Sequence, residues 1–160
     1  MTDMMNISEQ AESLARAVHA VLSADPAVQY GLGGTSDVPP RLYDAAPEDP
    51  VYPYLTYGAL RSEDIGADDT PLAVHQMTLH LWSRYKGRAE VMALLGTIGL
   101  ALDAEALTQA AKVSVRSATP VYSDVLRAPD GRTHHGLLRL SITTQPKFCL
   151  LYTSPSPRDS

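Results

Sequence analysis

Residues 75–102 read HQMTLHLWSRYKGRAEVMALLGTIGLAL and contain two hydrophobic periods in succession. In the first part, aliphatic and polar side chains alternate as in a half-buried strand, with Met77, Leu79 and Leu81 on one face. After Gly87, apolar residues recur at steps of three and four, the pattern of one helical stripe; they are Val91, Leu94, Leu95, Ile98 and Leu102. The stretch therefore predicts a strand and a helix whose apolar surfaces share one core.

The other face of this strand is mixed in character. It carries Gln76, Thr78, His80 and Trp82, the only tryptophan of the chain. A large aromatic ring with a polar indole N–H suits a partly wet contact surface. The alternative is that Trp82 belongs to an ordinary core near the end of the sheet, because a shift of one residue in register exchanges the two faces.

The flanking sequence predicts further elements of both kinds. The apolar residues of 7–23 lie on one helical stripe, with Ser8 before Glu9 as a start signal and Asp25-Pro26 as a stop signal. This segment therefore predicts an amphipathic helix. The glycine-rich residues 27–40 favour turns, since no lysine-serine or lysine-threonine pair makes them a phosphate loop. Alternation or extended character predicts strands at residues 41–44, 52–60, 112–117, 121–126 and 136–143. The expected class is α+β: a single domain with two amphipathic helices packed on a mostly antiparallel sheet.

Composition sets limits on function. The 160 residues include 13 Lys and Arg against 18 Asp and Glu, a net charge of −5, and no basic run stands out. This argues against a protein whose main task is to grip a nucleic acid backbone. No apolar run has the length of a membrane span, and the N-terminus lacks the features of a secretory signal, so cytoplasmic synthesis is expected.

The last residues differ from the rest of the chain. Residues 149–160 read CLLYTSPSPRDS, which resembles the translated transposase adapter of sequencing libraries. We therefore expect a native domain over residues 1–147 and a non-native tail over residues 148–160, which removes Cys149 from any redox or metal argument. The alternative is a disordered or proline-containing recognition tail.

Residues able to carry chemistry are present but do not converge. His75 and His80 are five apart on a strand, and His134 and His135 are neighbours, so each pair points to opposite faces. No set of three or four ligands for zinc can be assembled, and no G-x-S-x-G elbow brackets Ser83. The acidic residues 63–71 lack the spacing of a calcium loop. We therefore expect no catalytic residue, no metal and no cofactor.

Several short motifs, in their order, resemble the tail completion and tail terminator proteins of phages and gene transfer agents. They are RLYD at 41–44, YPYLTYG at 52–58, HLWSR at 80–84 followed by Gly87, and DGRTHHGLLRL at 130–140. The resemblance implies a subunit of a hexameric ring that caps the tail tube, stops its polymerisation and joins it to a head-side connector protein. It also implies that DNA passes through the ring without sequence-specific binding, that the protein moves from the cytoplasm into the virion, and that no catalytic residues are present.

A closed ring needs a heterologous interface, in which one patch of a subunit meets a different patch of the next. The candidate interface residues are Trp82, His80, Tyr52, Tyr54, Tyr57 and Arg84. Two alternatives stay open: a head-closure or minor tail component of the same particle, and, more distantly, a small enzyme with an unrecognised site.

Overall fold

The computed structural model describes residues 5–67, 69–85 and 87–147, which form five strands and four helices. The strands are β1 (Leu42–Tyr43), β2 (Tyr54–Asp64), β3 (Ala73–Ser83), β4 (Val113–Arg127) and β5 (His134–Pro146). The helices are α1 (Ile7–Ala24), α2 (Pro26–Gly31), α3 (Ala89–Ala101) and α4 (Ala104–Ala110). The tail predicted at residues 148–160 lies outside the described residues.

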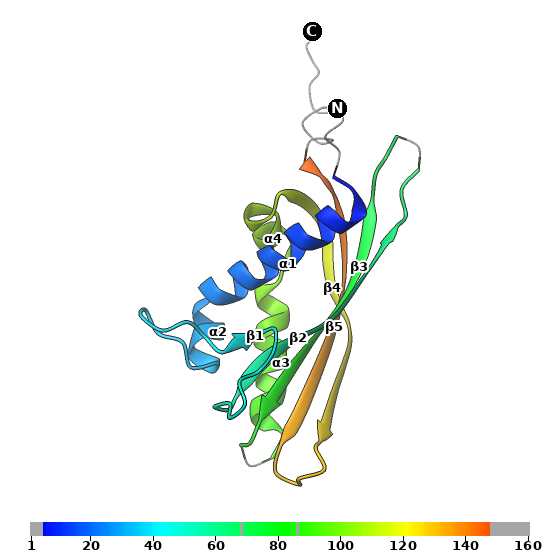
Figure 1. The fold of residues 1–160 in the computed structure, drawn as a ribbon. Coiled ribbons are helices and arrows are strands. Elements are labelled where there is room, and N and C mark those ends of the chain that lie inside the picture. Colours follow the sequence, from blue (N-terminus) through cyan, green and yellow to red (C-terminus); the bar gives the residue numbers. More distant parts are fainter. Residues whose placement is uncertain (1–4, 68, 86, 148–160) are drawn as a thin grey trace.

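The strands form one sheet in the order β1-β2-β3-β5-β4. The short β1 pairs with β2 in parallel, and every other neighbouring pair is antiparallel. All four helices cover the same face of this sheet, which leaves the other face without helices (Figure 1). The predicted class, an α+β domain with a mostly antiparallel sheet, is confirmed.

The predicted strand and helix of residues 75–102 are present as β3 and α3. Met77, Leu79 and Leu81 are at most 5% exposed and point toward the helices, where the five predicted residues of the helical stripe are also buried. Gly136 on β5 lies so close to α3 that an added Cβ would come within 2.6 Å of Val91 Cγ2. Strand β3 and helix α3 therefore share one core, as the two periods predict.

Two of the four helices, α2 and α4, were not predicted from the sequence. Asp25-Pro26, predicted as a stop, ends α1 and also begins α2, because the Asp25 carboxylate accepts a hydrogen bond from the Val28 N–H. Asp103 caps α4 in the same way through Ala106. Both helices are only one to two turns long, so they carry too few apolar residues to show a helical period.

Strand boundaries also differ from the prediction. The two strands predicted at 112–117 and 121–126 are a single strand, β4, with irregularities between Val115 and Ser117 and between Pro120 and Tyr122. Each irregularity inserts an extra residue, which shifts the alternation by one and makes a continuous strand look like two. Strand β2 extends to Asp64, so the acidic connection is shorter than predicted.

Among the described residues no single helix has the length and apolarity to cross a membrane, and only the pair α3 and α4, bent by 64°, passes on length and composition.

Candidate interaction surface

A row of ring side chains crosses the helix-free face of the sheet. Trp82 on β3 stacks on His135 of β5 with 4.0 Å between ring centroids and an interplanar angle of 4°. On its other side Trp82 stacks on Tyr54 of β2, at 6.3 Å. We call this group the aromatic row; its members are Tyr43, Tyr52, Tyr54, His80, Trp82 and His135.

The strand register explains why these rings meet. Trp82 is directly opposite Tyr54 on one neighbouring strand and His135 on the other, so all three side chains emerge on the same face. Tyr43 lies opposite Thr56, which is opposite His80, and so β1 contributes its ring to this face as well. The row thus draws on four adjacent strands.

Hydrogen bonds fix the rings in place. The Trp82 indole Nε1–H donates to Thr56 Oγ1 at 3.1 Å, and His80 Nδ1 lies 2.8 Å from His135 Nε2. Burial lowers the pKa of both histidines, and His80 further lowers the pKa of His135. One neutral imidazole can donate to the other only while the acceptor nitrogen is unprotonated, so the lowered pKa values preserve this bond at neutral pH.

A glycine makes room for the histidine pair. An added Cβ at Gly58 would lie 2.6 Å from His80 Nε2 and 3.0 Å from the Thr78 carbonyl oxygen. Gly58 lies in the irregular part of β2, between Tyr57 and Leu60, where the register with β3 shifts. A side chain at this position would push His80 away from His135.

The end of the row is tied to the β4–β5 turn by Arg84. Its guanidinium lies 4.3 Å from the centre of the Tyr52 ring, donates from Nε to Thr133 Oγ1 at 2.9 Å, and is 3.5 Å from the Asp130 carboxylate. Hydrogen bonds from Thr133 and from the Arg132 N–H lower the pKa of Asp130. Arg84 thus connects the aromatic row to this turn.

Two further tyrosines differ in their surroundings. Tyr54 is 7% exposed, and burial together with the neighbouring Tyr52 raises the pKa of Tyr54 to about 12. Tyr57 points the other way, because it lies opposite Leu79 on the helix-covered face, and its hydroxyl is 2.8 Å from His19 Nδ1 of α1. Of the six predicted interface residues the structure therefore brings together five, and it separates Tyr57 from them.

Tyr43 and His135 were not predicted as members of the row. The prediction that His134 and His135 point to opposite faces is correct, but it compared residues within one strand only. His80 and His135 meet across strands that are joined through two helices and β4, and no local pattern gives that register. The DGRTHHG motif was the available signal, since its turn starts the strand that carries His135.

Chemically, the aromatic row and its neighbour Arg84 offer ring side chains, tyrosine hydroxyls and a guanidinium. No group of three or more His, Cys, Asp or Glu side chains that could hold a metal occurs within residues 5–67, 69–85 and 87–147. A surface of this kind can bury rigid aromatic area against a partner at a small cost in side-chain entropy. Such a surface is suited to contact with other proteins.

The comparison with protein families agrees with this class. The family model described as "Tail completion protein gp17" matches residues 16–145, and the chain belongs to that family. It is a structural tail completion protein, and the predictions of its family and of a non-enzymatic role are confirmed.

Solved structures confirm the fold. The chain is similar to one in a structure described as "Virion of native gene transfer agent (GTA) particle", with a TM-score of 0.71 and 21% sequence identity. The similarity covers 85% of this chain and 97% of that chain. No curated protein matches the sequence.

Proposed function

We propose that the protein caps the tail tube as a ring, stops tube polymerisation and helps to join the tail to the head. Its partners are other copies of itself, in a ring expected to be hexameric, the tail tube protein and a head-side connector protein. The protein acts at the top of the tail, after assembly in the bacterial cytoplasm. The observation that carries the proposal is membership of the tail completion family over residues 16–145.

The charge of the chain is compatible with DNA passing through such a ring. A bore lined with many Lys and Arg residues would hold the phosphate backbone and release counterions, which opposes transit. The chain has a net charge of −5, so DNA can pass without sequence-specific binding and without being retained.

The aromatic row is the proposed contact surface. Trp82, Tyr52, Tyr54 and Arg84 belong to the residue types most enriched among those that dominate binding energy, and His80 adds a further ring beside Trp82. Ring closure needs two different patches per subunit, and this face supplies one of them. Tyr57 faces a different surface and is not part of this patch.

Deleting the gene in the source strain tests the proposal directly. Electron microscopy should show DNA-filled heads without tails beside free, overlong tails, and a plasmid copy of the gene should restore joined particles. Heads that lose their DNA beside free tails of normal length would instead assign the protein to head closure. Normal tailed particles would refute a role in tail completion by this chain.

A further inference from the structure

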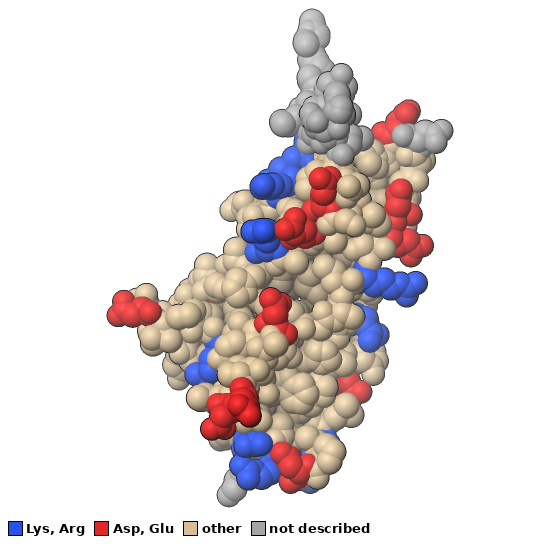
Figure 2. All heavy atoms as spheres, viewed as in Figure 1, with Lys and Arg blue, Asp and Glu red and all other residues tan. Residues whose placement is uncertain are grey.

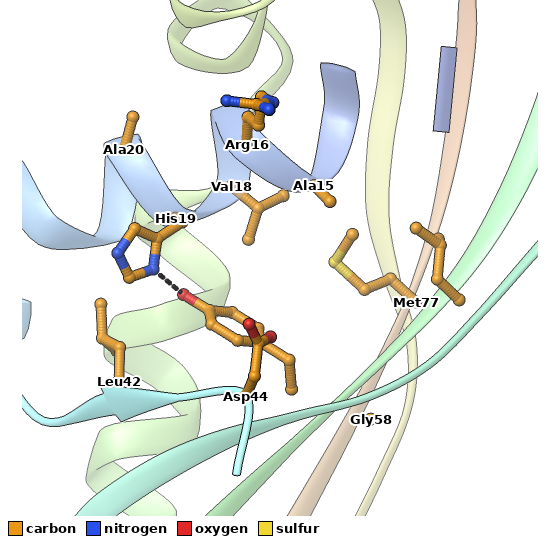
Figure 3. A pocket seen from close by; sticks show the side chains of 11 residues that line it. Ala15, Arg16, Val18, His19, Ala20, Leu42, Asp44, Gly58 and Met77 are labelled. Carbon is orange, nitrogen blue, oxygen red and sulfur yellow. Dashed lines mark hydrogen bonds between the residues drawn. The ribbon is translucent and has the colours of Figure 1, made fainter. Parts of the chain in front are cut away.

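One edge of the sheet carries an open hollow between α1 and β2. Its volume is about 560 Å³, and its walls are largely apolar, with Val18, Leu42, Leu60 and Met77 among the lining residues. Figure 3 shows Val18 on the helix and Met77 on the sheet lining this space, with His19 reaching from α1 toward its hydrogen-bond partner. We call this space the α1–β2 hollow.

The hollow is open because the edge of the sheet is incomplete. Strand β1 pairs with β2 only at Leu55 and Thr56, while β2 continues to Asp64. Beyond Thr56, no strand among the described residues covers the outer edge of β2. The hydrogen bond between His19 and Tyr57 closes one wall of the hollow. Burial, and then the Asp44 carboxylate, raises the pKa of Tyr57 and keeps its hydroxyl protonated.

The opposite edge of the sheet, β4, has exposed apolar side chains. Val121, Tyr122 and Leu126 are each about half exposed, at 52%, 47% and 48%. Val121 is the extra residue of the irregularity between Pro120 and Tyr122, so it departs from the regular alternation. Bulges and proline oppose strand-to-strand pairing at an edge, which favours contact through side chains here.

The two chain segments that carry these edges differ in charge. Residues 37–69, which include β1 and β2, contain eight Asp and Glu against two Arg, and residues 112–147, which include β4 and β5, contain six Lys and Arg against two Asp. Figure 2 shows acidic side chains gathered at the end of the β2–β3 hairpin. Such complementary edges favour copies that meet head to tail and disfavour contact between like edges.

We infer that the β4 edge of one copy docks on the acidic β2 edge of a second copy, with the exposed apolar side chains around Val121 seated in the α1–β2 hollow. The contact is heterologous, as a ring requires, and the inference rests on the proposed ring function. Arg116 and Arg127 flank the seated segment in sequence and are exposed, and in the docked pair they approach the edge that carries Asp44 and Glu63.

The aromatic row supports this arrangement. Tyr43, at one end, lies on β1, and His135 lies opposite Leu126, which is exposed on β4. The rings and Leu126 thus span all five strands from one edge to the other. In the docked pair, Leu126 of one copy approaches Tyr43 of the next, and the row continues across the contact.

Crosslinking of paired cysteines tests whether the copies contact each other head to tail. The chain would carry Ala15→Cys and Val121→Cys, both at exposed positions, with Cys149→Ser, and would be treated with a short bismaleimide. A head-to-tail contact gives a ladder of dimers, trimers and larger species, whereas a mixture of the two single variants gives dimers only. Absence of the ladder, or dimers from either single variant alone, overturns the inference.

Charge reversal and filling of the hollow test the two surfaces separately. Arg116→Glu with Arg127→Glu, or Asp44→Lys with Glu63→Lys, should each weaken self-association at least tenfold, and combining all four changes in one chain should restore most of it. Ala15→Phe, which fills the hollow, should also weaken association, while Ala93→Phe, at an exposed site of α3 outside it, should not. Equal effects of both phenylalanines, or no restoration in the combined variant, contradict the proposed surfaces.

The outcomes separate this inference from the proposed function. Rings that form normally in the hollow-filled and charge-reversed variants would refute the contact while leaving the gene-deletion result untouched. Normal particles after gene deletion would refute the function even if purified copies crosslink as expected. Unfolding curves of each variant confirm that its monomer is intact.

Discussion

The two faces of strand β3 use neighbouring residues for different purposes. Met77, Leu79 and Leu81 face the helices and are at most 5% exposed, whereas His80 and Trp82 lie on the helix-free face and stay partly accessible. The packing of the first face against the helices is stabilised by burial of apolar surface, which is non-directional. The second is held by stacked rings and hydrogen bonds of fixed geometry. One strand thus separates the residues that stabilise the subunit from those suited to recognise a partner.

The largest effect is expected on the helix-covered face. Leu81→Ala removes a side chain that is 1% exposed and leaves a cavity in the core, so the free energy of unfolding should fall by about 2–5 kcal/mol. Urea unfolding followed by circular dichroism measures this change. A loss no greater than that of the adjacent Trp82→Ala would contradict the assignment of the two faces.

A slightly smaller loss of stability is expected from a substitution where β5 contacts α3. The added methyl of Gly136→Ala would clash with Val91 and press on Leu95, so the overpacked core should cost about 1–3 kcal/mol of stability. The combined variant Gly136→Ala with Val91→Ala tests the cause, because removing the Val91 methyl groups should relieve part of the clash. Strict additivity of the two losses would exclude direct contact as the reason.

Acid should destabilise both faces through their histidines. Burial holds the pKa of His75, His80 and His135 below the ordinary value of 6.5, so the unfolded chain binds more protons than the folded one. Their contribution to stability is therefore complete above about pH 6.5 and is lost as pH falls below it, through the lowered pKa values of the folded state. Urea midpoints should be constant from pH 8 to 7 and decline toward pH 5.

A substitution at His75 tests this prediction at a single histidine. Thr144 Oγ1 donates to Gln10 Oε1, so His75 Nε2–H donates to Thr144. Burial lowers the pKa of His75 and so favours the neutral imidazole, in which Nδ1 accepts from Ser62. His75→Gln should lower stability at pH 7.5 and flatten its decline in acid, and an unchanged slope would assign the acid effect to His80 and His135.

Much of the fold follows from local patterns in the sequence. The alternation of residues 77–82 and the stripe of residues 91–102 gave β3, α3 and their shared core correctly, because each period extends over several repeats. Helices α2 and α4 were missed because they are short and depend on the caps Asp25 and Asp103. Strand β4 was divided because its two irregularities break the alternation.

The candidate site was less accessible to prediction. Trp82, His80 and Tyr54 could be grouped because β2 and β3 are consecutive strands with alternating patterns. His135 could not be added, because β5 pairs with β3 only after α3, α4 and β4 have intervened. Tyr57 was grouped with Tyr52 and Tyr54 by proximity in sequence, but its odd spacing from Tyr54 turns it to the other face, and an irregularity follows it directly.

Trp82→Ala probes the recognition face with a modest effect on the monomer. Loss of the stacking on His135 and Tyr54 should lower stability by about 0.5–1.5 kcal/mol beyond the change in buried area. Self-association, measured by sedimentation velocity, should also weaken, because Trp82 stacks on Tyr54 and Tyr54 packs on Tyr43, which lies at the β1 edge of the inferred contact. Trp82→Phe, which keeps a ring but loses the bond to Thr56, should retain most of the association.

The smallest effect, a gain, is expected at Gly96 on the exposed side of α3. A Cβ at this position meets no atom within 4 Å, and alanine in a helix interior is favoured over glycine by about 0.8–1.0 kcal/mol, so Gly96→Ala should stabilise the monomer by up to that amount. Self-association should not change, because the inferred contact uses the α1–β2 hollow and the β4 edge. Weaker association in a more stable monomer would show that a partner approaches α3 closely, and would move the contact surface from the sheet edges to the helical layer.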